Sequence, residues 1–337
     1  MTNGGRWIFF IAIITIGVIS LTLSFQTAQG VIGEILITEG AEKSFCDQIS
    51  ANLTGVINAL ETKDLSNVRA FFTDEGYSLA SDVLQRVPME NARRTHRTHL
   101  LRLPRGGWEV RDIKVSVEMG ETANNKEPVA ANPNQFLVFE LSPDGLIRDM
   151  RFAMESAHCK RILEEGEKLN DFARRQQILQ TVEIFRTAYC RKDTAYLKQI
   201  YSDDALILVG RVLKPRKDVP DMFKTSRLSP KKIEFLRLSK KQYIERLDSL
   251  FERNAFVKVI FDSVDISCND KDPYLYGVTL KQNWYSSTYS DTGWVFLLWD
   301  FKDEENPTIY VRSWQPEPFE DGSILNQFEF VVVRGNE

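Results

Sequence analysis

Histidine is scarce in this chain, with three residues among 337. Two of them, His96 and His99, lie in the segment RRTHRTHLLR, where four neighbouring arginines would repel a bound cation. We therefore expect both histidines to be surface residues, and we predict no metal site and no cofactor. The stretch from Ile178 to Pro316 holds no histidine at all, which removes a common general base from that half of the chain.

The chain also lacks an excess of positive charge, because its formal net charge is −4. This balance argues against a nucleic-acid binder that works by bulk electrostatics. Arginines at 93–105 and lysines and arginines at 214–232 form local basic runs. They could meet an acidic partner or an anionic glycan, or they could be solvated loop faces. A hydrophobic content of 43% and a charged content of 27% are typical of a folded protein.

Cysteine is also rare, with four residues. Cys46 and Cys159 bracket the first half of the chain, so a disulfide between them would tie the two ends of that half together. The alternative is that they are buried free thiols. Four cysteines allow three connectivities, and we favour Cys46–Cys159 among them.

A single long apolar run is present at 7–24 (WIFFIAIITIGVISLTLS). Arg6 precedes it and acidic residues follow it, which predicts export of everything after the run. Residues 1–30 are then either a cleaved signal peptide or an uncleaved membrane anchor. We expect the rest of the chain in the periplasm, or anchored to the membrane and facing the periplasm or the exterior.

One unit occurs twice in the chain. The stretch KDTAYLKQIYSDDALILV at 192–209 aligns without a gap to KDLSNVRAFFTDEGYSLA at 63–80, at an offset of 129 (192 − 63). Phe72 corresponds to Tyr201 in this alignment. Both copies are predicted to form a helix, a turn and then a strand, so we expect two related domains.

Helical spacing of apolar residues predicts the first helix of each copy, over 45–60 and from 178 onward. Ser239 and Gln242 form a capping box that predicts the start of a further helix. The segment 83–105 is expected to be irregular or partly helical. The remaining strands are predicted at 108–117, 135–141, 147–152, 256–266, 276–285, 294–301 and 308–314, with turns at 143–145 and 290–293.

Helices followed by long antiparallel strands indicate the α+β class. The helix ending in Arg191-Lys192-Asp193, the next helix ending at Tyr201 and the strand SDDALILVG at 202–210 resemble the nuclear-transport-factor-2-like (SnoaL-like, cystatin-like) superfamily. The resemblance implies a curved sheet that wraps the helices into a cone with an open end. We therefore expect two tandem cone-shaped domains, each with helices packed on a curved antiparallel sheet, after the N-terminal hydrophobic segment.

The resemblance covers 178–316 well and 49–152 approximately. The second half also looks like uncharacterised exported bacterial proteins that carry YGVTLKQNW and SSTYSDTG, at 276–284 and 286–293. The predicted boundaries are 1–30 for the leader or anchor, 44–155 for a degenerate first domain, 156–177 for a helical connector and 178–335 for the second domain.

The candidate ligand site is the aromatic sheet of the second domain. Strand alternation places Tyr276 and Trp284 on one face of their strand, and Tyr310, Arg312 and Trp314 on one face of the last strand. If these faces line the cone, they form an aromatic pocket with a few polar groups. The alternative is that the aromatics fill the cone as core. The full candidate set is Tyr276, Trp284, Tyr289, Asp300, Tyr310, Arg312 and Trp314.

The resemblance also implies what an enzyme of this type would need. Isomerases and cyclases of the superfamily place an Asp or His base inside the cone beside a Tyr or acid donor. Asp203 and Asp204 match the turn residues Asp74 and Glu75 of the first copy, and the absence of histidine removes the His-Asp pair. We therefore predict no catalytic residues.

The sequence favours a non-catalytic, exported interaction or scaffold module of the cell envelope. The alternative is a binder of a small hydrophobic ligand, or an isomerase- or cyclase-type enzyme, that uses the second cone. The expected partner is a protein of the envelope or such a ligand, and we expect no nucleic acid. Contact with a membrane is expected only through residues 7–24, if they are not cleaved. A homodimer is a further option. A filled cone would favour the first function, and an open cavity with inward Asp or Tyr the second.

Overall fold

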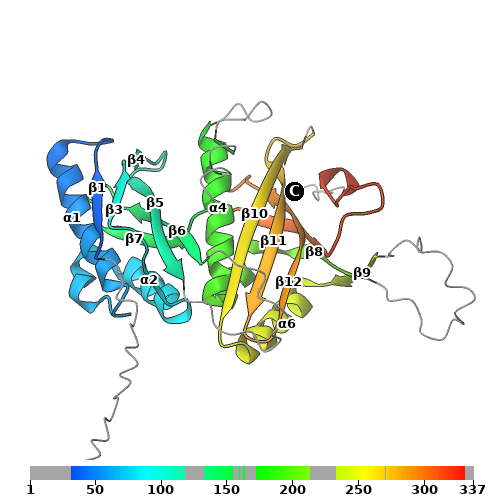
Figure 1. Ribbon diagram of the computed structural model, residues 1–337. Helices are drawn as coiled ribbons and strands as arrows, with labels where there is room; N and C mark the ends of the chain where they lie inside the picture. The colour runs from blue at the N-terminus through cyan, green and yellow to red at the C-terminus, as the bar shows by residue number, and fades with distance from the viewer. Residues whose placement is uncertain are drawn as a thin grey trace, which may run out of the picture.

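The computed structural model describes residues 32–117, 133–154, 159, 162–163, 172–212, 233–269 and 271–330. These residues form two α+β domains, each with helices packed against a curved, mainly antiparallel sheet, which confirms the predicted fold class (Figure 1). The apolar run at 7–24 lies outside the described residues. None of the described helices combines the length and apolar character that a membrane span requires.

The first domain has three helical segments and two sheets in its described part. Strand β5 is central in its larger sheet, whose order is β2-β5-β6-β7 with β4 also paired to β5, while β1 and β3 form a parallel pair. Its elements are β1 (Glu34–Ile37), α1 (Lys43–Ala59), η1 (Ser66–Phe71), α2 (Asp74–Arg86), β2 (Met89–Asn91), β3 (Thr95–Thr98), β4 (Leu101–Arg102), β5 (Trp108–Val117), β6 (Asn134–Leu141) and β7 (Ile147–Phe152).

The second domain has six strands in its described part, in the order β10-β11-β12-β13-β8-β9. Its inner face packs against three helices, one of which starts at the predicted capping box of Ser239 and Gln242. Its elements are α4 (Phe172–Arg191), α5 (Thr194–Ile200), β8 (Tyr201–Val212), β9 (Ile233–Leu238), α6 (Lys240–Arg253), β10 (Val257–Cys268), β11 (Leu275–Ser286), β12 (Ser290–Asp300), β13 (Thr308–Gln315) and η3 (Gln327–Glu329). Residues 172–177, expected in the connector, belong to α4.

The repeated unit is visible in the backbone up to Phe72 and Tyr201. Lys63 and Lys192 both follow the first helix of their domain with positive φ angles of 56° and 58°. Phe72 forms an isolated parallel bridge with Ile147 of β7, just as Tyr201 pairs in parallel with Ile309 of β13. The sheet partner at this position is therefore the same in both domains.

Beyond this point the prediction of a strand in the first copy is wrong. Thr73 accepts a hydrogen bond from the Gly76 amide at 3.0 Å and so caps helix α2, whereas the matching Ser202 lies in strand β8. The residues explain the difference. Helix α2 buries Ala80, Val83 and Leu84 at helical spacing, while β8 buries Ala205 and Ile207 two residues apart, as a strand does. The first domain therefore lacks counterparts of β8 and β9 among its described residues.

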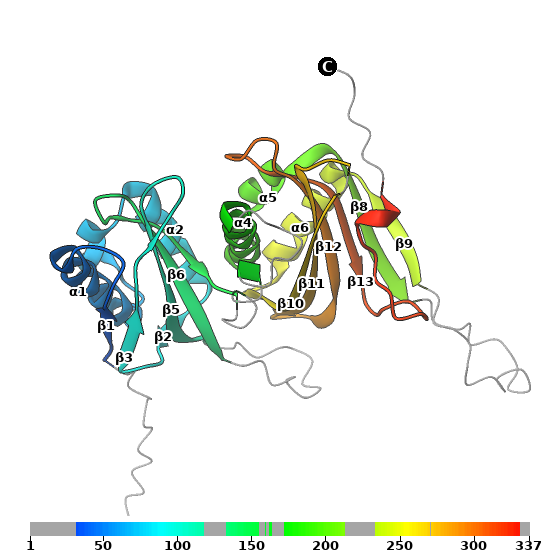
Figure 2. The same cartoon turned by 90° about the horizontal axis from the view of Figure 1, so that it is seen from above.

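Helix α4 occupies the space between the two sheets (Figure 2). Its buried residues lie on all sides, which is typical of a helix covered all round rather than on one face. The Phe152 and Met154 amides at the end of β7 donate to Thr187 Oγ1 at 3.0 Å and Glu183 Oε1 at 2.8 Å. One turn away, Arg186 Nε donates to the Val259 carbonyl of β10 at 2.7 Å. One helix thus completes an edge of each sheet.

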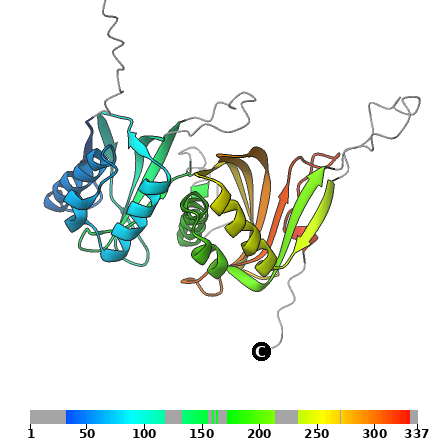
Figure 3. The ribbon, with the colours of Figure 1, turned by 90° about the horizontal axis from the view of Figure 1, so that it is seen from below.

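Arg186 also joins the two domains directly. Its Nη1 donates to the Ala153 carbonyl, just after β7, at 2.6 Å. The same guanidinium therefore bonds backbone groups from both domains. The view from below shows α4 and α6 side by side in the second domain, with α2 on the far side of α4 (Figure 3).

Three local expectations are corrected by the structure. His96 was expected at the surface but is buried, because its side chain on strand β3 points inward, and its Nε2 lies 2.8 Å from Asn91 Oδ1. Separately, no cluster of metal-ligand side chains occurs among the described residues. The predicted turn at 290–293 belongs to β12, and the chain reverses at 286–289 instead. Cys46 and Cys159 are free thiols, so the predicted disulfide is not formed. Burial raises the pKa of the Cys159 thiol to about 12.

Candidate functional site

Four of the seven candidate residues gather near one end of the second cone. Trp284, Arg312 and Trp314 face the helices from β11 and β13. Tyr289 lies at the end of the β11–β12 hairpin, is half exposed, and donates its hydroxyl to Asp291. Asp291 pairs across the strands with Trp284, which places it on the same inner face.

The other three candidates lie elsewhere. Tyr276 is buried at the far end of β11, where its ring meets Phe301 edge-on. Asp300 ends β12 and accepts a hydrogen bond from the Lys302 amide at 2.8 Å, so it shapes a turn. Tyr310 packs on the outer face with Val311, because a β-bulge between residues 309 and 311 breaks the alternation. The expectation that Tyr310 shares a face with Arg312 is wrong for that reason.

Three tyrosines complete the cluster at the inner end. Tyr189 of α4 is the hub, with its hydroxyl 2.6 Å from that of Tyr243 and 3.3 Å from that of Tyr201. The guanidinium of Arg312 lies over the Tyr243 ring, 4.9 Å from its centre. This cation–π contact holds the charge in a fixed place.

The cluster is rich in hydrogen-bond donors. Within the described residues, Arg312 Nε and Trp284 Nε1 are buried and have no hydrogen-bond partner, and Asp291 Oδ1 is also unpaired. Burial raises the pKa of the Tyr201 and Tyr243 hydroxyls well above its usual value, so both stay protonated at neutral pH. Burial also raises the pKa of Asp291, against the opposing effects of its Tyr289 hydrogen bond and the Arg312 charge. Such a site can hold an oxygen that carries negative charge.

Sequence reasoning missed Asp291 and the three tyrosines as members of this cluster. Asp291 lies in the segment predicted as a turn, and Tyr201 was predicted only as the end of a helix. The available signal was the alternation of β11 carried across the hairpin, which sets Asp291 opposite Trp284. The cluster combines α4, α6, β8, β11, β12 and β13, and only their packing brings it together.

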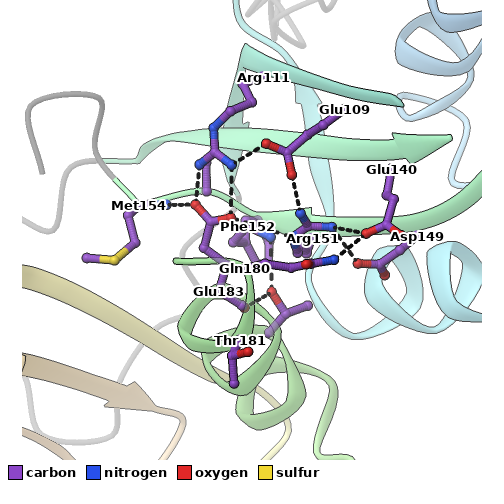
Figure 4. Close-up of polar contacts among 12 residues, drawn as sticks. Glu109, Arg111, Glu140, Asp149, Arg151, Phe152, Met154, Gln180, Thr181 and Glu183 are labelled. Atoms are coloured by element: carbon purple, nitrogen blue, oxygen red, sulfur yellow. Dashed lines mark hydrogen bonds and ion pairs between the residues drawn. The ribbon is translucent and has the colours of Figure 1, made fainter. Parts of the chain in front are cut away.

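A second polar cluster lies between the domains (Figure 4). Register places Glu109, Glu140 and Asp149 opposite one another on β5, β6 and β7. Three acids in one row would repel, but Arg151 lies among them, with Nη2 2.6 Å from Glu109 and Nη1 3.0 Å from Asp149. Its Nε lies 3.5 Å from Glu183 of α4, an ion pair without hydrogen-bond geometry.

Arg111 completes this interdomain ion network. Its guanidinium bonds both oxygens of Glu183 and lies 2.8 Å from Glu109. Burial opposes ionisation of Glu109, but Arg151 and Arg111 outweigh it and hold the pKa of that carboxyl below its usual value. Since these charges are buried and paired with one another, the network joins the domains rather than forming an open site.

Solved structures similar to part of this chain include a naphthalene 1,2-dioxygenase with indole in its active site, at 8% identity and TM-score 0.35, covering 44% of this chain and 82% of that one. An NTF2-like protein from Cytophaga hutchinsonii is 16% identical with a TM-score of 0.30, and the match covers 42% of this chain and 97% of that one. Nuclear transport factor 2 from Cryptosporidium parvum is 9% identical with a TM-score of 0.29, and the match covers 42% of this chain and 91% of that one. No protein-family model and no curated protein matches the chain. At TM-scores of 0.35 and below these likenesses carry no argument, so function is argued from this chain's own residues.

Proposed function

We propose that this chain is a non-catalytic binding protein whose second domain takes a small apolar carboxylate at the inner cluster. The observation that supports this most is Arg312, a buried guanidinium with which no described carboxylate forms an ion pair. Its charge is met by the Tyr243 ring, by the tyrosine hydroxyls and by the field of Asp291, which compensate a buried guanidinium less well than a directly bonded carboxylate. A ligand carboxylate would supply a stronger partner. Because Arg312 Nε and Trp284 Nε1 have no exposed surface in the described structure, it would reach them only by displacing part of the aromatic packing.

Binding rather than turnover is supported by the chemistry of the remaining groups. The hydroxyls of Tyr201 and Tyr243 stay protonated because burial raises their pKa, so they donate well and are poor bases. The rings of Tyr243, Trp284 and Tyr189 offer apolar surface beside the charge. A small aromatic carboxylate combines both properties that this lining requires.

Benzoate and benzyl alcohol, which share a ring and differ in charge, separate this proposal from simple apolar binding. Calorimetric titration of the whole protein should show binding of benzoate and at least tenfold weaker binding of benzyl alcohol. Arg312→Met keeps the apolar stem and should abolish the difference, whereas Arg211→Met, at an exposed position on β8, should leave it intact. Equal binding of the two probes, or full benzoate binding by Arg312→Met, would contradict the proposal.

A scaffold role in the cell envelope is the second candidate. It is favoured by the interdomain ion network, which fixes two domains into one unit that could present surfaces in a constant arrangement. The export predicted from residues 7–24 belongs to this proposal. Alkaline phosphatase fused after residue 31 should be active, since its disulfides form only outside the cytoplasm; an inactive, stable fusion would rule export out.

A further inference from the structure

A groove of about 910 Å³ lies on the outer face of the second sheet, away from the cone. Its floor carries Ser263 and Asp265 from β10, Thr279 from β11 and Trp294 from β12. Register confirms that they share one face, because Asp265 pairs with Thr279, and Lys281 pairs with both Ser263 and Trp294. The volume falls in the range of about 300–1,000 Å³ that small-molecule sites occupy.

The wall of this outer groove is the C-terminal segment 322–328, drawn in red in Figure 1. The segment is fixed at several points. Gln327 Nε2 donates to the Cys268 carbonyl at 3.0 Å, and the Phe330 ring stacks on Phe296 with centres 5.6 Å apart. Gly277 allows this close approach, since a Cβ there would lie 3.2 Å from Gln327 Cβ. The groove is therefore formed before any ligand binds, which lowers the entropic cost of binding.

The lining offers several hydrogen-bonding groups to a ligand. Gln327 is 3% exposed and fixes the wall, so the accessible polar groups are those of the floor. Asp265 adds an exposed carboxylate, and the hydroxyls of Ser263 and Thr279 can both donate and accept.

The aromatic side chains define the other half of the ligand. Trp294 is half-buried in the floor, and Phe328 is 78% exposed on the wall. Aromatic rings of this kind bind flat apolar faces while neighbouring groups bond a polar rim. The described lining contains one carboxylate, and Lys281 lies on the same face between Ser263 and Trp294, so this face carries one charge of each sign and favours a neutral ligand.

We propose that the outer groove binds a neutral saccharide chain. The C–H face of a pyranose ring stacks on Trp294, and its hydroxyls donate to the Asp265 carboxylate and bond the Ser263 and Thr279 hydroxyls. This site is separate from the inner cluster, because its residues lie on the opposite face of the sheet. It therefore stands or falls independently of the carboxylate site.

Calorimetric titration of the whole protein with cellohexaose, maltohexaose and chitohexaose tests the proposal. Because the groove is open and polar, we expect at least one of them to bind with a Kd below about 1 mM. Trp294→Ala should weaken that binding at least tenfold, and Asp265→Asn, at an exposed position, at least threefold. Tyr274→Ala is the matched control, since it removes an exposed aromatic outside the groove and should change nothing.

Benzoate titration of the same variants separates this site from the inner cluster, because Trp294→Ala should keep full benzoate affinity. Three results would overturn the saccharide proposal. The first is that none of the three saccharides binds at about 5 mM, far above the expected Kd. The second is that Trp294→Ala binds as the unsubstituted protein does. The third is that an extended peptide such as hexathreonine binds with the same dependence on Trp294 while the saccharides do not.

Discussion

From Lys63 to Phe72 and from Lys192 to Tyr201 the two domains share a turn with positive φ, a short helical segment and a parallel bridge to the last strand of the sheet. They then differ completely. The second domain continues into β8, which pairs with β13 again from Leu206 to Val209, while the first turns into helix α2 after one bridge. Aligned residues with the same sheet partner can therefore enter different secondary structures when capping and apolar spacing change.

The difference also explains how the domains are joined. Without counterparts of β8 and β9, β7 has an edge that needs other partners, and side chains of α4 supply them. In the second domain the corresponding strand β13 is paired on both sides. The first domain thus depends on the second in a way that the second does not depend on the first.

The largest expected effect comes from removing Glu183, one of the two carboxylates that pair with both Arg111 and Arg151. Glu183→Ala leaves Arg111 and Arg151 undercompensated at a buried position and removes the partner of the Met154 amide. We expect a loss of about 3–5 kcal/mol in the free energy of unfolding. Urea denaturation measures it, and Glu245→Ala, in an exposed pair on α6, serves as the matched control with a loss below about 0.5 kcal/mol. A loss as small as that of Glu245→Ala would show that the interdomain ion network does not stabilise the fold.

A smaller loss is expected at the point where the two copies diverge. Gly76 lies so close to β7 that a Cβ would stand 2.2 Å from the Ile147 carbonyl oxygen. Gly76→Ala should therefore destabilise the protein by about 1–3 kcal/mol despite the better helix propensity of alanine. Thermal melting of Gly76→Ala is compared with that of Ala80→Gly, which alters the same helix without a clash. Propensity alone would make the first variant more stable and the second less stable, whereas the clash makes both less stable. A more stable Gly76→Ala variant would contradict the contact.

The two sides of α4 should respond differently to pH. Burial lowers the pKa of Lys258 on β10 to about 8, whereas an unfolded lysine titrates near 10.5. Between these values the unfolded chain binds more protons, so this residue's contribution to stability rises with pH. Glu109 has a lowered pKa, so its contribution is lost as pH falls below the unfolded value.

Denaturation of Lys258→Met beside the unsubstituted protein measures the alkaline half of this prediction. At pH 7.5 Lys258→Met should have the larger free energy of unfolding. This difference should shrink by about 1–2 kcal/mol by pH 10, because the lysine then no longer carries a buried charge. Lys241→Met, at an exposed position, should show no such trend. A constant difference across this range would show that Lys258 is charged in the fold at both ends.

The smallest effect concerns the turn that the copies share. Lys63 and Lys192 adopt positive φ, which glycine tolerates better than lysine. Lys63→Gly should gain about 0.5–1 kcal/mol. Lys192→Gly should gain less than relief of the backbone strain alone would give, because it also removes the bond from Lys192 Nζ to the Ala255 carbonyl at 3.1 Å. A gain of about 1 kcal/mol at Lys192, measured by denaturation, would mean that this bond contributes nothing.

Much of the fold follows from local patterns. Local patterns located β5, β6, β7 and, apart from β9, the strands of the second sheet within a few residues, and the Ser239 cap located the start of α6. The failures have physical causes. The bulge beside Tyr310 reverses the face of a single residue, and an alignment carried past Phe72 predicted a strand where Thr73 caps a helix.

The sites were harder to predict than the fold. Arg312 and Trp284 were found because they alternate along single strands, whereas Asp291 required the register of a hairpin. The outer groove depends on where 322–328 crosses the sheet, and the interdomain ion network joins strands to a helix far along the chain. Such pairings are set by tertiary packing and leave no periodic signal in the sequence.

Amide hydrogen exchange at the end of β7 tests most directly whether α4 completes the first domain's sheet. Thr187→Val keeps the shape of the side chain and removes the acceptor for the Phe152 amide. We predict at least tenfold faster exchange at Phe152 in this variant, with the amides of β11 and β12 unchanged. Unchanged exchange at Phe152, or equal acceleration throughout both sheets, would contradict the dependence of the first domain on α4.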